Sequence, residues 1–340
     1  MFDETATPVE AAVSTASAAP ETKRSTVIPV LGAGRSGTSA ITRGLEALGV
    51  DLGHNLRSGS GKNPTGFFED NDVLAISKQL KRALDIRGHS VRLLDDAEFE
   101  TPRIKQIQAQ AIKTLGQRFG DTPLWGYKYS RTLRTMPFWA GIHDALNLDV
   151  RYLIALRNPM SVARSRGKIN PQRGRQVWSD MEWLVNVVPY FHRLAGRPCA
   201  VVDFDRLMAD PRGQLLRVAR DLDLPVGPAE QAGIDEYAEQ FLVQGKPSTR
   251  FSRDDLIADP WVNRWTAEGY ALLDEVAADD LSLDSPAFVE RWAGVEAGVR
   301  DLGPFLAEFD HLRTTRVRAG WNPASPIREM QQVWRDLKAK

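Results

Sequence analysis

A glycine-rich segment with a single cation, residues 32–39 (G-A-G-R-S-G-T-S), is well suited to bind an anion. Its glycines let successive backbone N–H groups turn inward, and a helix that begins near Thr38 adds the positive end of its dipole. The glycine spacing matches the G-x-x-x-x-G of phosphate loops, but Thr38 stands where kinases and ATPases carry the lysine that reaches the terminal phosphates. The cation here is Arg35 instead.

A second candidate for anion binding follows the apolar run of residues 150–156. There Arg157 opens the sequence R-N-P-M-S-V-A-R-S, and Ser165 stands eight residues after it. A buried guanidinium without an anionic partner is costly, so an arginine at the end of an apolar strand needs such a partner. That partner is either a carboxylate of the protein or a bound phosphate.

The two motifs together resemble the donor-binding elements of the bacterial-type sulfotransferase family. Members carry Lys or Arg followed by Ser/Thr-Gly-Thr-Thr/Ser after the first strand, matched here by R-S-G-T-S at residues 35–39. Their second element is Arg-Asn/Asp-Pro with a serine eight residues after the arginine, matched by Arg157 and Ser165. A weaker match is V-V-D-F-D-R-L at residues 201–207. The resemblance spans residues 26–222.

This resemblance implies transfer of the sulfuryl group of 3'-phosphoadenosine-5'-phosphosulfate to a hydroxyl or amine by in-line displacement, without a metal. The product left by the donor would be adenosine 3',5'-bisphosphate (PAP). A looser match places two later cations, Lys246 and Arg250, over the 3'-phosphate. The implied donor-binding residues are Gly34, Arg35, Ser36, Gly37, Thr38, Ser39, Arg157, Ser165, Lys246 and Arg250.

Transfer also needs positive charge beside the sulfonate and a base for the acceptor's proton. Arg35 would lie near the phosphosulfate bridge, and Lys128 resembles the family's lysine that contacts the sulfonate. Two residues later, where cytosolic members carry their catalytic histidine, this chain has a serine, which cannot be the base at neutral pH. Members without the histidine often use a glutamate from the loop after the first helix, so we expect Glu69 as the base, with Asp70 and His54 as alternatives. Glu69 could instead be a solvated helix cap.

Strands that alternate with helices must position these residues. Four apolar runs predict strands at residues 27–31, 124–129, 150–156 and 199–204, with helical patterns at 104–119, 176–194 and 211–222 between and after them. We expect an α/β fold with a three-layer parallel sheet of P-loop type, helices on both faces and a helical C-terminal extension. Pro29 inside the first run favours an irregularity or an exposed edge.

Three regions are expected along the chain. Residues 1–24 are rich in Ala, Ser, Thr and Glu and predict a disordered arm. Residues 25–250 would form the sulfotransferase domain, and residues 251–340 a mainly helical extension that packs on the same domain. Charge is uneven: residues 128–175 hold ten basic and two acidic side chains, whereas residues 251–310 hold four basic and fourteen acidic ones.

Composition excludes several classes of protein. The 44 Lys and Arg balance 44 Asp and Glu, so the chain lacks the net positive charge that would predict nucleic-acid binding. The single cysteine, Cys199, excludes a disulfide framework and favours a reducing, cytoplasmic setting. No run approaches the ~18 apolar residues of a membrane span. The expected partner is a small-molecule, lipid or carbohydrate acceptor.

Two other functions stay open from the sequence alone. The chain could be a phosphate-loop kinase or NTPase in which Asp203, at the end of a strand, holds magnesium. It could also be a nucleotide-binding interaction protein without turnover.

Overall fold

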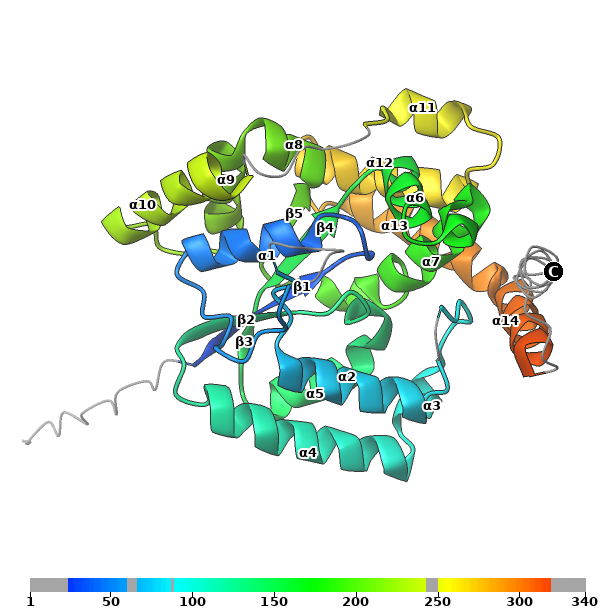
Figure 1. Ribbon diagram of the computed structural model, residues 1–340, viewed down its shortest axis with the longest axis horizontal. Helices are drawn as coiled ribbons and strands as arrows, with labels where there is room; N and C mark the ends of the chain where they lie inside the picture. Colours follow the sequence, from blue (N-terminus) through cyan, green and yellow to red (C-terminus); the bar gives the residue numbers. More distant parts are fainter. Residues whose placement is uncertain (1–23, 60–65, 87–88, 243–249, 319–340) are drawn as a thin grey trace, which may run out of the picture.

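The four predicted apolar runs form a parallel sheet in the computed structural model shown in Figure 1. β1 (Thr26–Leu31) lies between β2 (Leu124–Lys128) and β4 (Tyr152–Leu156), and β5 (Cys199–Asp203) completes the order β2-β1-β4-β5. The predicted α/β class and parallel sheet are confirmed. The structure describes residues 24–59, 66–86, 89–242 and 250–318, with only the backbone of 314–318, so the expected arm, apart from Arg24, lies outside it.

Pro29 lies in a central strand, which corrects the expectation of an edge. On one side, β1 pairs continuously with β2 and sets Pro29 opposite Tyr127. On its other side, β1 pairs first with β3 (Asp149–Val150) and then, from Val30, with β4 in the same register. Proline has no N–H to donate, so the ladder is interrupted beside it and the predicted strand 150–156 is divided in two. The predicted irregularity is therefore present.

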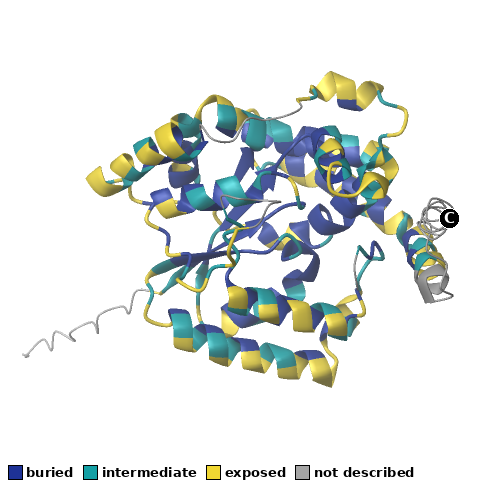
Figure 2. Ribbon diagram, in the orientation of Figure 1, coloured by how far each residue is buried: buried dark blue, intermediate teal, exposed yellow. Residues whose placement is uncertain are grey.

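Side chains that alternate along the strands build two cores, one on each face of the sheet. Ile28 and Val30 face one core, and Val27 and Leu31 face the other. The first face is covered by α1 (Thr38–Ala47), α9 (Pro211–Asp221) and α10 (Pro228–Glu236). The second face is covered by α2 (Asn71–Ala83), α4 (Pro102–Phe119), α5 (Met136–Ala145) and α7 (Gln176–Val187). Figure 2 shows the buried strands between these helices.

The described residues after 250 are mainly helical. They form α11 (Arg253–Ala258), α12 (Arg264–Ala277), α13 (Pro286–Asp301) and α14 (Gly303–Arg318). α12 and α13 join the core of the second face through Leu273 and Trp292. The remaining elements are α3 (Asp96–Phe99), α6 (Pro159–Gly167) and α8 (Phe204–Ala209), 3-10 turns at Leu133–Thr135, Pro171–Gly174 and Phe191–Leu194, and a π turn at Tyr237–Phe241.

Three short polar side chains start the helices next to the predicted site. Asp70 accepts hydrogen bonds from two backbone N–H groups at the start of α2, and Asn158 accepts one at the start of α6. Asp203 accepts two backbone hydrogen bonds at the start of α8. Such caps satisfy the N–H groups that the first turn of a helix leaves unpaired. In the described residues, no helix combines the length and the apolar character needed to cross a membrane.

Candidate active site

The glycine-rich segment turns from β1 into α1, as predicted, and its glycines are needed for close packing. Gly37 precedes α1 with a φ of 78°, and a Cβ at this position would lie 2.1 Å from the ring of Phe204. Gly32 has a φ of 121°, and a Cβ there would lie 2.4 Å from the carbonyl oxygen of Ala155. A side chain at Gly32 would therefore clash with the end of β4, and one at Gly37 with the start of α8.

Two buried donors at this loop have no hydrogen-bond partner among the described residues: Oγ of Ser36 and Nε of Arg157. Arg157 is 8% exposed and stacks 4.8 Å from the ring centre of Phe204. Burial lowers its pKa and the charge of Arg35 adds to the effect, whereas the charges of Asp205 and Asp203 act in the opposite direction. Leaving a buried donor or charge unpaired is costly, so these atoms fit an anion bound at the loop.

Arg35 joins the two sequence motifs. Its Nε donates to Oγ of Ser165 at 3.0 Å, and its carbonyl oxygen accepts from Arg157 at 3.4 Å. Burial lowers the pKa of Arg35, with a further contribution from the charge of Arg173. Ser165 was expected beside the phosphate bound by Arg157, and here it also holds the cation of the first motif.

Lys128 ends β2 with its ammonium group against the loop that precedes α2. The residue is 3% exposed, and its Nζ donates to Oγ of Ser39 at 3.1 Å and to the carbonyl oxygen of Phe67. Oε1 of Glu69 lies 3.5 Å from the same Nζ. Burial lowers the pKa of Lys128, whereas the charge of Glu69 acts in the opposite direction. The fold thus brings together Lys128, Ser39 and Glu69.

The three candidate bases have different surroundings. Glu69 contacts Lys128 and also accepts a hydrogen bond of 2.9 Å from Arg57. Asp70 is 2% exposed and is engaged in capping α2 and in an ion pair of 2.7 Å with Arg118. His54 is exposed in the loop after α1. Of the three, Glu69 is the residue that the structure brings to Lys128.

Of the other predicted site residues, Gly34 and Thr38 belong to the same loop and the helix start that follows it. A Cβ on Gly34 would lie 3.9 Å from Oγ of Ser130, and Thr38 is buried in the first turn of α1. Arg250 is exposed, with its Nε 3.8 Å from Asp205 beside the cap of α8. Lys246 lies outside the described residues.

Asp203 has a structural role as the cap of α8. Oδ1 accepts the two backbone hydrogen bonds, and the buried Oδ2 has no partner among the described residues. Burial raises the pKa of Asp203 to about 6. Within the residues that the structure describes, no group of three or more His, Cys, Asp or Glu side chains could hold a metal ion.

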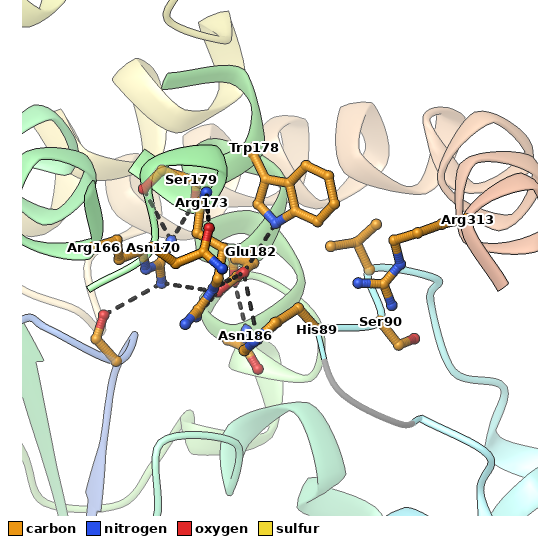
Figure 3. Close-up of polar contacts among 12 residues, drawn as sticks. His89, Ser90, Arg166, Asn170, Arg173, Trp178, Ser179, Glu182, Asn186 and Arg313 are labelled. Carbon is orange, nitrogen blue, oxygen red and sulfur yellow. Dashed lines mark hydrogen bonds and ion pairs between the residues drawn. The ribbon is translucent and has the colours of Figure 1, made fainter. Parts of the chain in front are cut away.

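Sequence reasoning missed a cluster of charged groups beneath the phosphate loop, shown in Figure 3. Arg166, on α6, donates to the carbonyl oxygen of Gly34 at 3.3 Å and lies 3.6 Å from Oε2 of Glu182 on α7. Glu182 also accepts two hydrogen bonds, of 2.8 and 2.7 Å, from Arg173. A single carboxylate thus faces two guanidinium groups. The run of basic residues at 128–175 includes Arg166 and Arg173, but no sequence pattern pairs them with Glu182.

Comparison with solved structures gives matches to sulfotransferases. The sulfotransferase domain of the Synechococcus PCC 7002 olefin synthase is 16% identical over 77% of this chain and 98% of its own, with a TM-score of 0.40. Sulfotransferase STF9 from Mycobacterium avium is 14% identical over 82% of this chain and 76% of its own, with a TM-score of 0.37. Retinol dehydratase, in complex with androsterone and the inactive cofactor PAP, is 15% identical over 82% of this chain and 80% of its own, with a TM-score of 0.37.

No protein-family model matches the chain, and no curated protein matches it.

Proposed function

We propose that this protein is a sulfotransferase that moves the sulfuryl group of 3'-phosphoadenosine-5'-phosphosulfate to a hydroxyl or amine of an acceptor. One observation carries the proposal: Oγ of Ser36 and Nε of Arg157 are buried donors without a partner among the described residues, at two motifs that Arg35 links. These two hydrogen-bond donors, at motifs that Arg35 links, suit a ligand that carries phosphate at two positions. The 3',5'-bisphosphate part of the donor is such a ligand.

The donor is held by this chain's backbone and cations. The turn of residues 34–39 and the start of α1 present backbone N–H groups and the hydroxyls of Ser36, Thr38 and Ser39 to the 5'-phosphate. Arg157 binds the 3'-phosphate through its unpaired Nε. Arg250, whose Nε lies 3.8 Å from Asp205, contributes to the same 3'-phosphate site. Lys246 is assigned to this site as well.

Lys128 and Arg35 supply the charge that the reaction requires. When bound, the phosphosulfate donor supplies an activated sulfuryl group. As this group is transferred, negative charge develops on the donor oxygen from which it departs. Nζ of Lys128 is already held by Ser39 and Phe67, and Arg35 by Ser165, so both cations are oriented before the donor binds. Fixed charges of this kind stabilise a transition state without reorganisation.

Glu69 takes the proton from the acceptor. Its carboxylate is 15% exposed and lies 3.5 Å from Lys128, at the point where an acceptor would approach the transferred group. A general base has to be within hydrogen-bond reach of the proton it removes. Arg57 and Lys128 hold the carboxylate from two sides.

Melting curves distinguish this function from a magnesium-dependent kinase or NTPase. PAP in a metal-free buffer should raise the melting temperature, because a ligand that binds only the folded state stabilises it, and ATP should do so much less. Stabilisation by ATP that depends on magnesium, with no effect of PAP, would contradict the proposal and return Asp203 to the role of magnesium ligand.

A further inference from the structure

Arg35 has a backbone conformation that is unfavourable for a residue with a side chain. Its φ is 80°, in the left-handed region, and Gly37 two residues later has a φ of 78°. Glycine adopts such angles freely, whereas a residue with a Cβ is strained there. Strain of this kind persists only where surrounding contacts hold the backbone in place. The conformation of Arg35 therefore depends on whatever holds its two peptide groups.

Two buried guanidinium groups hold these peptide groups. Nη2 of Arg166 donates to the carbonyl oxygen of Gly34 at 3.3 Å, and Nη1 of Arg157 donates to the carbonyl oxygen of Arg35 at 3.4 Å. The first contact holds the peptide group that precedes Arg35, and the second holds the peptide group that follows it. In the proposed binding of the donor, Arg157 has a role and Arg166 has none.

Arg166 is fixed from α7 before it reaches the loop. It is 2% exposed, and its Nη1 donates to the carbonyl oxygen of Ser179 at 2.7 Å and to the hydroxyl of Ser179 at 2.9 Å. Figure 3 shows these contacts between α6 and α7. A guanidinium presents its N–H groups in a rigid planar fork. The bonds to Ser179 therefore determine where Nη2 points, which is toward Gly34.

Glu182 compensates the buried charge of Arg166. Its Oε2 lies 3.6 Å from Nη2 of Arg166, and its two oxygens accept from Arg173 at 2.8 and 2.7 Å. Oε1 also accepts from Nε1 of Trp178 at 3.1 Å. Burial opposes ionisation of Glu182, but the hydrogen bonds from Arg173 and the charge of Arg166 lower its pKa to about 2. The carboxylate is therefore ionised at neutral pH, as a buried guanidinium requires of its partner.

We propose that Arg166 is a positioning residue of the donor loop. It holds the peptide group between Gly34 and Arg35 and so maintains the left-handed conformation that directs the Arg35 side chain to Ser165 and to the donor. Glu182 keeps Arg166 charged and in place. This inference rests on the proposed function, because the role of Arg35 in binding the donor belongs to that function.

The test is a double-mutant cycle of PAP affinity, measured by calorimetry without metal. In the wild-type background, Arg166→Gln should weaken PAP binding about 5- to 10-fold, because a hydrogen bond from a charged group is lost and Arg35 is no longer directed to the ligand. In the Arg35→Ala background, the side chain that Arg166 directs is already absent. There Arg166→Gln should weaken binding at most about 2-fold further.

Arg164→Gln is the matched control, because it removes an exposed arginine from the same helix, and it should bind PAP as the wild type does. Equal losses from Arg166→Gln in the two backgrounds, or no loss in the wild-type background, would overturn the inference. If Arg166→Gln shows no cooperative melting, Arg166→Lys replaces it with the same expectation. Lysine keeps a cation beside Glu182, but its single ammonium group lacks the fork that joins Ser179 to Gly34.

Hydrogen exchange of the protein without nucleotide separates this inference from the proposed function. The N–H of Ser36 donates to the carbonyl oxygen of Ala33 at 3.2 Å across the same turn. In Arg166→Gln, the amides of residues 33–37 should exchange about 10-fold faster than in the wild type, while those of β1 stay unchanged, because the loss is local. Unchanged exchange at residues 33–37 would overturn the inference. If wild-type protein does not bind PAP, the proposed function fails, and the exchange result alone decides whether Arg166 holds the loop.

Discussion

Glu69 and Lys128 meet where the loop before α2 crosses the end of β2, with 3.5 Å between Oε1 and Nζ. The lysine has two other oxygen partners, in Ser39 and Phe67, so it remains in place without the carboxylate. Glu69 in turn is bound by Arg57. Lys128 is thus fixed by the loop, and the Glu69 carboxylate lies between the cations of Lys128 and Arg57.

Glu69→Gln should therefore lower turnover by about 10²- to 10⁴-fold and leave PAP affinity nearly unchanged, because general-base catalysis is lost and the donor-binding groups are intact. The measurement is transfer of labelled sulfate to any acceptor that the wild type uses, together with a PAP titration. His54→Gln is the control and should keep full turnover. Wild-type turnover in Glu69→Gln at every pH between about 6 and 9 would place the base elsewhere.

The sequence was sufficient for the local parts of the site and insufficient for the contacts between them. The sequence predicted that residues 35–39 and Arg157 follow strand ends, because each motif lies within one strand end and its following turn. The hydrogen bond from Arg166 to Gly34 joins residues 132 positions apart, and the partner of Arg166, Glu182, is on another helix. No local pattern encodes such a contact, because it depends on how α6 and α7 pack on the sheet.

At the scale of elements, the loop before α1 requires a backbone that only glycine adopts easily. Gly37 combines a φ of 78° with close contact to Phe204, and Phe204 supports the guanidinium of Arg157. The conformation of one turn therefore sets the distance between the glycine-rich segment and Arg157. Pro29 also has a local effect on the backbone. It interrupts the hydrogen-bond ladder between β1 and the strands β3 and β4, while β1 remains a central strand.

Gly37→Ala should destabilise the protein by roughly 1–3 kcal/mol and weaken PAP binding, because the new Cβ meets Phe204 and the left-handed turn is strained. Gly294→Ala is the matched control. Gly294 lies within α13 with open space at its Cβ position, so alanine should raise stability by about 0.5–1 kcal/mol. Denaturant unfolding measures both changes. Equal stability of the two variants would contradict this account of the loop.

Asp180 connects α7 to the segment before α12 and makes stability depend on pH. It is 1% exposed, and Oδ2 accepts from the backbone N–H of Asn263 at 2.8 Å. Burial raises its pKa to about 7. Between about pH 4 and 7 the folded state then holds a proton that the unfolded chain has released, so this contribution to stability is lost as pH rises through that window.

Asp180→Asn should remove that dependence. Melting temperatures from about pH 4.5 to 7.5 should show the variant gaining on the wild type as pH rises, whatever its stability at the lowest pH. Two curves that stay parallel across the range would show that Asp180 does not titrate there.

At the scale of the whole molecule, the neutral net charge conceals two regions of opposite sign that mostly do not neutralise each other. Acidic residues after 250 form ion pairs with arginines that lie outside residues 128–175. Asp274 pairs with Arg206, and Asp279 with Arg217. Asp310 is an exception, since α14 brings it to the backbone of Val91, beside the contacts of Arg134. The acidic region after residue 250 therefore does little to neutralise the basic residues of 128–175, whose acidic partners include Glu69 and Glu182.

Asp310→Ala should cost about 2–4 kcal/mol of stability, because it leaves the N–H groups of Val91 and Arg92 and the hydroxyl of Ser90 without a buried acceptor. Glu308→Ala, exposed on the same helix, should change stability by less than about 0.5 kcal/mol. Denaturant unfolding of the full chain measures both. If the two variants lose equal stability, α14 does not support the segment that holds Arg134.

The most direct test of the central claim is the affinity for PAP relative to adenosine 5'-monophosphate, which lacks the 3'-phosphate, measured by calorimetry without metal. The wild type should prefer PAP by about 10- to 100-fold, because a hydrogen bond to a charged group contributes about 1.5–3 kcal/mol. Arg157→Ala should bring the ratio close to one, whereas Arg164→Ala, which removes an exposed arginine from the following helix α6, should preserve it. Equal affinity of the wild type for the two nucleotides, or a preference that survives in Arg157→Ala, would contradict the account.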